Sequence, residues 1–165
     1  MSEPIRAAYS NWPQYNAAFH DVVEQLTDEQ LGTQPSSDRW PLWATIGHAA
    51  CQRVFWLCVF LGAPGEADTP FPNSGFNCPG DDDLDTVWSG TQLAEALDST
   101  FRVIDWCLDN WTVESLADVI THKEDPRSYT RGSLVQRVFA HDLTHIAELN
   151  ETLSRLGLAQ VDIWD

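Results

Sequence analysis

Residues 131–157 of this 165-residue chain read RGSLVQRVFAHDLTHIAELNETLSRLG, and this stretch decides the fold. Its apolar stripe consists of Leu134, Val138, Leu149 and Leu156. Because these residues recur at helical spacing, they predict one amphipathic helix from about Arg131 to Leu156. Gly157 follows directly, as is typical of the residue that ends a helix.

Two histidines, His141 and His145, lie one turn apart within this predicted helix. At about 100° per residue they share the sector of the apolar stripe, so both imidazoles are expected to point into the core. A buried polar group without a partner costs roughly 1–3 kcal/mol. Something must therefore satisfy both rings, and one shared metal ion would do so.

Three further segments are predicted to be helical. They are residues 11–26 (stripe Trp12, Tyr15, Phe19, Val22, Leu26), residues 41–61 (apolar nearly all round) and residues 93–111 (stripe Leu93, Leu97, Phe101, Ile104, Leu108, Trp111). A short capped turn is expected at 27–32 and a long Pro- and Gly-rich surface loop at 62–86. A connector without strands is expected at 112–130, where Asp125-Pro126 predicts a turn. We therefore expect a single all-α domain over residues 1–165, built as a four-helix bundle with a long connection between helices 2 and 3.

Residues 41–61 approach the length of a membrane span, but they contain His48, Gln52 and Arg53. One arginine in mid-membrane costs roughly 2.5–3.5 kcal/mol, so a buried helix that partly forms a dimer contact is the better interpretation. The formal net charge is −16, which disfavours nucleic acid and anionic membranes as partners. The first residues lack the pattern of an export signal, so a cytoplasmic protein is expected.

The four cysteines show no CxxC pair, and reduced thiols are expected of a cytoplasmic protein. Cys51 and Cys58 are seven residues apart on one predicted helix, about 10 Å along its axis and too far to bridge. Cys107 falls in another predicted helix and Cys78 in the long loop.

A third histidine, His48, lies on the central apolar helix and completes the predicted metal ligands His48, His141 and His145. Three neutral imidazoles with one open position suit zinc, nickel, iron or copper. We expect a divalent transition metal, zinc or nickel before iron or manganese. His20 and His122 are interpreted as surface histidines.

The sequence does not match two familiar metal-binding motifs. Metalloproteases need Glu directly after the first histidine, where this chain has Asp142, and di-iron bundles need Glu three residues before a ligand histidine. A mononuclear site remains. Glu148 points into nearly the same sector and could be a fourth ligand, a hydrogen-bond partner of a ligand, a catalytic proton acceptor or simply a solvated acid. Cys51 and Gln52 share the face of His48 and could line the site.

Two segments resemble the DinB/YfiT-like superfamily of metalloenzymes. Trp40-Pro-Leu-Trp-Ala-Thr-Ile-Gly-His48 is similar to the family's Trp and first ligand histidine, and His141-Asp-Leu-Thr-His145-Ile-Ala-Glu-Leu is similar to its closing HxxxH helix. The resemblance implies an up-down-down-up four-helix bundle, a metal held by the three histidines, and a homodimer.

The same resemblance implies a function. Better understood relatives use low-molecular-weight thiols in transfer or isomerisation reactions, so a metal-dependent enzyme with a small-molecule substrate is expected, either a thiol-dependent S-transferase or a hydrolase using metal-bound water. The alternative is a non-enzymatic metal-binding bundle with a structural, sensing or dimerising role. The third and blandest reading is a metal-free core in which the three histidines satisfy one another.

Overall fold

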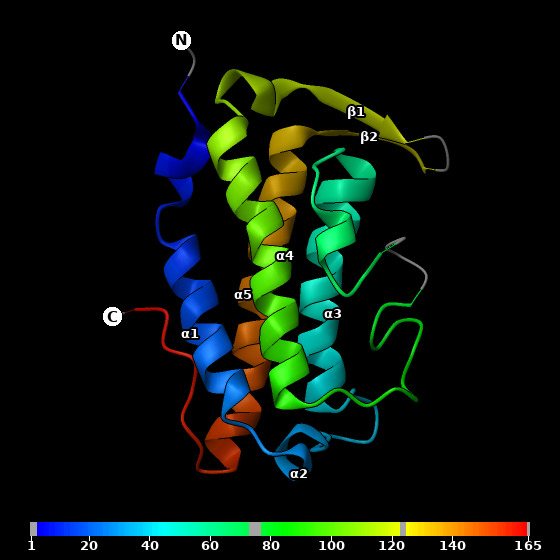
Figure 1. Ribbon diagram of the computed structural model, residues 1–165, viewed down its shortest axis with the longest axis vertical. Coiled ribbons are helices and arrows are strands. Elements are labelled where there is room, and N and C mark those ends of the chain that lie inside the picture. The colour runs from blue at the N-terminus through cyan, green and yellow to red at the C-terminus, as the bar shows by residue number, and fades with distance from the viewer. Residues whose placement is uncertain (1–2, 73–76, 123–124, 165) are drawn as a thin grey trace.

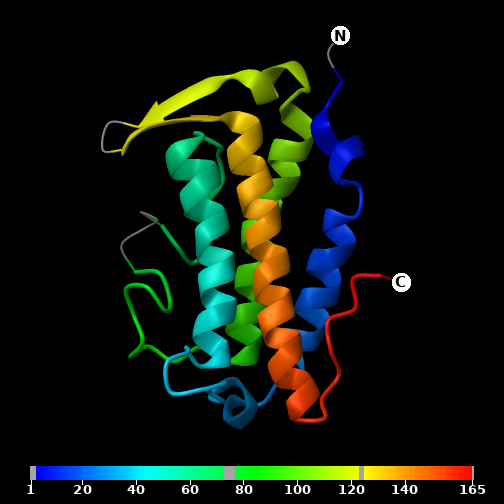
Figure 2. The same ribbon diagram turned by 180° about the vertical axis from the view of Figure 1, so that it is seen from behind.

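The computed structural model describes the chain except for residues 1–2, 73–76, 123–124 and 165. It is mostly helical, and its four long helices are α1 (Trp12–Glu24), α3 (Leu42–Val54), α4 (Gly90–Asn110) and α5 (Arg131–Arg155). They lie side by side, with α4 against both α1 and α3, and α3 against α5 (Figures 1 and 2). The contact between α3 and α5 is where the predicted histidines meet.

The helix ends follow from their capping residues. Thr27 and Gln30 form a capping box at α2 (Asp28–Leu31), and Ser89 and Gln92 form another at α4. Thr130 caps α5 by accepting a hydrogen bond from the backbone of Ser133. These elements agree with the predicted short turn and with the predicted third and fourth helices. The described residues also form three short 3₁₀ helices, η1 (Ile5–Tyr9), η3 (Glu66–Asp68) and η4 (Glu114–Ala117).

The central apolar helix is buried on several sides, as predicted. Within α3, residues from Leu42 to Val54 are buried almost without interruption, and the helix continues as a π-helical turn, η2 (Phe55–Phe60). Among the described residues, none of the helices combines the length and the apolar character that crossing a membrane requires.

The prediction of a strandless connector at 112–130 was wrong. Strands β1 (Val119–His122) and β2 (Asp125–Thr130) form an antiparallel pair in which Ile120 lies opposite Tyr129. Pro126, which predicts a turn, lies at an irregularity in the pairing, where a missing backbone N–H is tolerated. The β-branched residues Val119, Ile120 and Thr121 of β1 favour the extended chain.

The long connection between η2 and α4 is more than a surface loop. Thr69, Phe71 and Cys78 are buried, and Phe71 stacks on Trp88 with ring centroids 5.5 Å apart. Cys78 forms a disulfide with Cys51 of α3, so the expectation that these thiols are reduced was wrong. The pairing joins positions 27 residues apart, which no local spacing could indicate.

Candidate metal centre

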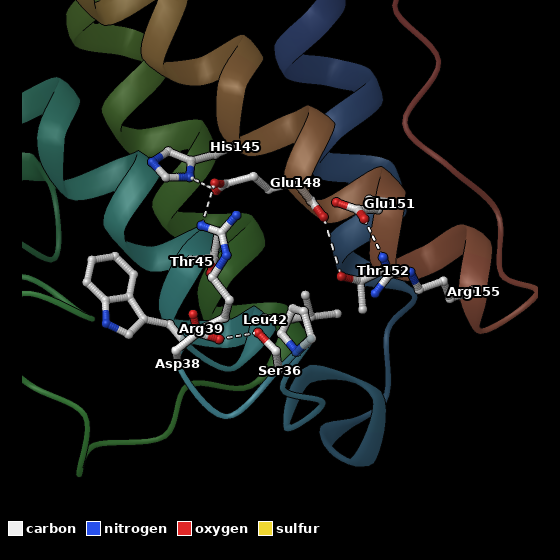
Figure 3. Close-up of a pocket in the computed structure, with 12 residues that line it drawn as sticks. Ser36, Asp38, Arg39, Leu42, Thr45, His145, Glu148, Glu151, Thr152 and Arg155 are labelled. Carbon is white, nitrogen blue, oxygen red and sulfur yellow. Dashed lines mark hydrogen bonds and ion pairs between the residues drawn. The ribbon is translucent and has the colours of Figure 1, made fainter.

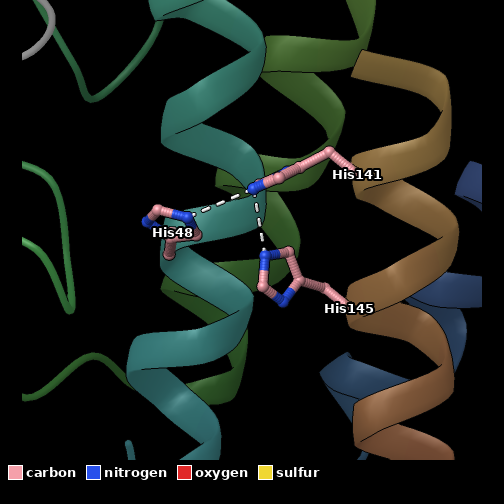
Figure 4. A group of neighbouring side chains, drawn as sticks. All are labelled: His48, His141 and His145. Carbon is pink, nitrogen blue, oxygen red and sulfur yellow. Dashed lines mark hydrogen bonds between the residues drawn. The ribbon is translucent and has the colours of Figure 1, made fainter. Parts of the chain in front are cut away.

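Three histidines converge between α3 and α5. His48 comes from α3, and His141 and His145 come from one face of α5 (Figure 4). The His48 ring centroid lies 5.1 Å from that of His141 and 5.2 Å from that of His145. The structure therefore brings together the three predicted ligands, which come from positions 93 residues apart in the chain.

The nitrogens that face one another are all Nε2. The His141 Nε2 atom lies 3.2 Å from that of His48 and 3.1 Å from that of His145. Two nitrogens bound tetrahedrally to one zinc ion at about 2.0–2.1 Å would lie about 3.3–3.4 Å apart. The three rings would therefore need to move apart only slightly for their Nε2 atoms to bind one ion.

Two carboxylates fix the outward nitrogens of these rings. Glu148 Oε2 lies 2.8 Å from His145 Nδ1, and Asp81 Oδ2 lies 3.3 Å from His48 Nδ1. A carboxylate only accepts hydrogen bonds, so the hydrogen bond to Glu148 places the proton of His145 on Nδ1, and Asp81 favours the same tautomer of His48. An uncharged ring that donates from Nδ1 presents the lone pair of its Nε2 atom to the centre of the cluster.

The cluster consequently cannot satisfy itself. His141 Nε2–H can donate to one neighbouring Nε2 but not to both, so at least one lone pair faces the interior of the cluster without a hydrogen. A divalent cation accepts all three lone pairs at once. Histidine ligands whose other nitrogen donates to a carboxylate are the usual arrangement at protein metal sites.

Burial disfavours the charged form of two of these imidazoles, His141 and His48. Loss of solvation lowers the pKa of His141 to about 3, with further lowering by the neighbouring His145 and His48. The pKa of His48 is also lowered, mainly by burial, although Asp81 opposes that shift. Neutral rings offer the lone pairs that a metal requires.

Trp40 packs on His48, which accounts for the eight-residue spacing between these two residues in the sequence. Its ring packs on His48 with centroids 5.0 Å apart. On the other side it contacts Gly80 so closely that a Cβ there would lie 2.7 Å from the indole. Trp40 therefore covers His48 and helps to seat the loop segment that carries Asp81.

A second polar cluster crosses the same helices and was missed from the sequence. Asp142 of α5, 2% exposed, accepts hydrogen bonds from Arg53 of α3 and from the indole of Trp12. Arg53, 1% exposed, also donates to Asn16, the Leu97 carbonyl and Thr100. The signal was available, since Arg53 is the only formal charge in an apolar segment and needs a buried partner.

A pocket of about 580 Å³ opens beside the triad and reaches it at His145 (Figure 3). Arg39 pairs there with Glu148 at 3.1 Å, and Arg155 pairs with Glu151. Three other arginines do not line this pocket: Arg53 is buried against Asp142, Arg131 lies over Trp111 and Arg137 lies over Trp56.

The remaining predicted residues lie as follows. Glu148 contacts the outer nitrogen of His145, the position of a hydrogen-bond partner of a ligand, and its catalytic role stays a prediction. Cys51 is bonded to Cys78, and Gln52 lies 3.5 Å from Asp81 on the loop side of His48. His20 is partly exposed beside Asp21 and Asp98. The side chain of His122 lies outside the described residues.

Comparison with known proteins agrees with the helical fold described above. The sequence profile of the DinB superfamily matches residues 14–149, so the chain belongs to the DinB superfamily. None of the curated proteins compared with the chain matches it.

Two solved structures share the fold. A DinB-like protein from Bacillus cereus ATCC 10987 superposes with a TM-score of 0.70 at 16% identity, covering 98% of each chain. A DinB-like protein from Bacillus subtilis gives a TM-score of 0.62 at 14% identity, covering 93% of this chain and 94% of the other.

Proposed function

We propose that this DinB-superfamily protein is a metal-dependent enzyme whose single divalent ion is held by the Nε2 atoms of His48, His141 and His145. The observation that carries the proposal is the convergence of three inward Nε2 atoms, with His141 Nε2 3.2 Å from that of His48 and 3.1 Å from that of His145, while Asp81 and Glu148 lie at the outward nitrogens. Zinc or nickel suits three imidazoles best, with iron and manganese as further candidates.

Three protein ligands leave a tetrahedral ion one position for a substrate or water. An ion bound there would supply Lewis acidity, which lowers the pKa of a thiol or of water. The chain's own residues would hold the rings in one tautomer and orient them. The adjacent pocket supports an enzyme over a purely structural site, because it gives a small molecule access to His145.

The pocket also bears on the substrate. It combines two arginines, Arg39 and Arg155, with the acids Asp38, Glu148 and Glu151. Such a lining suits a small polar molecule that carries both signs of charge, including a low-molecular-weight thiol of that kind. Glu148 would act as a proton acceptor only after release from Arg39, so we assign it first to the orientation of His145. We propose a thiol-dependent S-transferase or a hydrolase that activates water.

Two further proposals concern architecture. The up-down-down-up bundle is supported by the chain direction in Figure 1, where α3 and α4 rise while α1 and α5 descend. A homodimer contact at the end of the central helix is supported by the exposed Val59 and the half-buried Trp56 and Phe60 of η2. Sedimentation of the purified protein would test the dimer, and a monomer at micromolar concentration would contradict it.

Cobalt substitution tests the proposed enzyme site most simply. Cobalt-loaded protein is titrated with small thiols while the visible spectrum is recorded. An open, thiol-accepting site predicts a change in the ligand-field bands, and His145→Ala should abolish both the bands and the change. The bands could instead depend on His145 without responding to thiols. In that case, exchange of water at the metal would favour a hydrolase, and its absence would favour the non-enzymatic alternative.

A further inference from the structure

A disulfide ties one segment of the long connection to α3 beside the candidate metal centre. Cys51 lies one helical turn after His48, and its partner Cys78 lies three residues before Asp81. The Cys78 sulfur is 3.7 Å from His48 Nδ1, and Asp81 Oδ2 is 3.3 Å from the same atom. Residues 78–83 therefore present a carboxylate to the outward nitrogen of a predicted ligand.

This segment is seated closely on the helix. A Cβ at Gly47 would lie 2.8 Å from the Pro79 ring, so the backbone already approaches α3 as near as a glycine permits. Within the segment, the amide of Cys78 donates to Asp82 and the amide of Asp82 donates to the Cys78 carbonyl, which makes a tight turn. Any loosening must carry the segment away from α3.

The contact between Asp81 and His48 depends on this seating. The Asp81 side chain is 48% exposed, and an exposed contact between such groups is weak unless the backbone holds both partners in place. The other carboxylate differs, because Glu148 and His145 are three residues apart on one helix, whose own geometry keeps them together. One pair is fixed locally and the other by a cross-link.

We propose that the Cys51–Cys78 disulfide makes the metal affinity of the three-histidine site depend on redox state, by holding Asp81 against His48. This inference rests on the proposed function, since it assumes that the three histidines bind an ion. The oxidised protein, with Asp81 in place, is the form of higher affinity. The reduced protein loses the carboxylate from His48 Nδ1 and binds the ion more weakly.

The switching reaction is thiol–disulfide exchange with a dithiol reductant, either a small molecule or a protein. One thiolate of the reductant attacks one cysteine sulfur, the bond between Cys51 and Cys78 breaks, and the leaving sulfur takes up a proton. The second thiol of the reductant then attacks the mixed disulfide and releases the other cysteine. Two electrons and two protons pass to the protein, and the reductant leaves as a cyclic disulfide.

The two free thiols can no longer lie at bonding distance, and the contact at Gly47 prevents the segment from moving inward. We expect Asp81 to leave His48 in most molecules. Loss of a carboxylate from the outer nitrogen of a ligand histidine typically costs 10- to 100-fold in metal affinity. The expected effect of reduction is therefore a loss of about tenfold.

The test measures zinc affinity by competition with a chromophoric chelator. The full-length protein is compared as oxidised and as reduced with a water-soluble phosphine that is then removed without oxygen, and thiol counting verifies each state. Wild type should bind zinc about tenfold more weakly when reduced. The double variant Cys51→Ala with Cys78→Ala should match the reduced wild type, and Cys58→Ala should behave as wild type.

Asp81→Ala is the decisive variant, and Asp85→Ala, two residues beyond the segment 78–83, is its control. Asp81→Ala should bind weakly in both states, whereas Glu148→Ala should lose affinity yet keep the redox difference. Equal wild-type affinity in both states, or a redox difference that persists in Asp81→Ala, overturns the inference. So does a thiolate-to-cobalt charge-transfer band in the reduced protein, because sulfur would then be a ligand. If His48→Ala leaves the zinc affinity unchanged in both redox states, the proposed function is overturned as well.

Discussion

Two polar clusters join α3 to α5, and they differ in how completely their hydrogen bonds are satisfied. In the first, Arg53 and Asp142 neutralise each other, and the surrounding side chains complete their hydrogen bonds. In the second, three imidazoles turn the same nitrogen toward one another, and too few hydrogens are available between them. The protein alone satisfies the first cluster, whereas the second leaves room for the cation proposed above. A complete buried network indicates structure, and an incomplete one indicates a ligand.

Removal of one partner from the complete cluster should have the largest effect on stability. Asp142→Ala leaves the Arg53 guanidinium buried and uncompensated, so the free energy of unfolding should fall by about 3–5 kcal/mol. Chemical denaturation measures this, with Thr144→Ala on the exposed face of α5 as the control. A loss below about 1 kcal/mol would contradict this, because the Asp142 contacts would then contribute no more to stability than an exposed ion pair does.

The incomplete cluster should gain stability from metal. At a free zinc concentration of one hundred times Kd, the ion should add about 2.7 kcal/mol to the free energy of unfolding. His145→Ala should remove this gain, while His20→Ala, a histidine outside the cluster, should retain it. The gain is measured against the metal-free form of each variant, because His145→Ala also removes the hydrogen bond from His145 Nδ1 to Glu148. A gain that survives His145→Ala would show that zinc binds elsewhere.

The carboxylate within α5 should tune the metal affinity without affecting the fold. Glu148→Ala removes the acceptor of His145 Nδ1, so zinc affinity should fall about tenfold. Glu151→Ala is the matched control, because Glu151 lines the same pocket and pairs with Arg155. Competition with a chelator measures both variants. Equal affinities for the two would remove Glu148 from the metal site.

The last expected effect is a pH dependence of the metal-free protein. The pKa of His141 falls from 6.5 to about 3 on folding because its ring is buried. Between these values the unfolded chain binds more protons than the native one, so the free energy of unfolding falls as the pH falls below about 6.5. Thermal melts at about pH 6.5 and about pH 5 should show a smaller decline for His141→Gln than for wild type. An identical decline would mean that His141 is not buried as described.

The two clusters also differ in what the sequence could predict. The pair His141 and His145 is local to one helix, so its spacing and its inward face follow from helical periodicity. His48 could be added because it is a histidine in an apolar helix. Arg53 carried the same signal, an ionic group in an apolar segment, but its partner Asp142 was considered only as a departure from a protease motif.

Contacts made through the long connection were beyond sequence reasoning. Asp81 reaches His48, and Cys78 reaches Cys51, only because residues 78–83 fold back onto α3 at Gly47. No periodicity marks such a return, since Pro- and Gly-rich segments have no repeating face. The β-hairpin was missed for a related reason: its proline resembled a turn but lies at an irregularity of the pairing.

The most direct test of the central claim is the metal content of the protein after loading and gel filtration, measured by elemental analysis. The account predicts one ion per chain in wild type and in His20→Ala, and none in His48→Ala, His141→Ala or His145→Ala. A full complement of metal in the double variant His48→Ala with His145→Ala would contradict it.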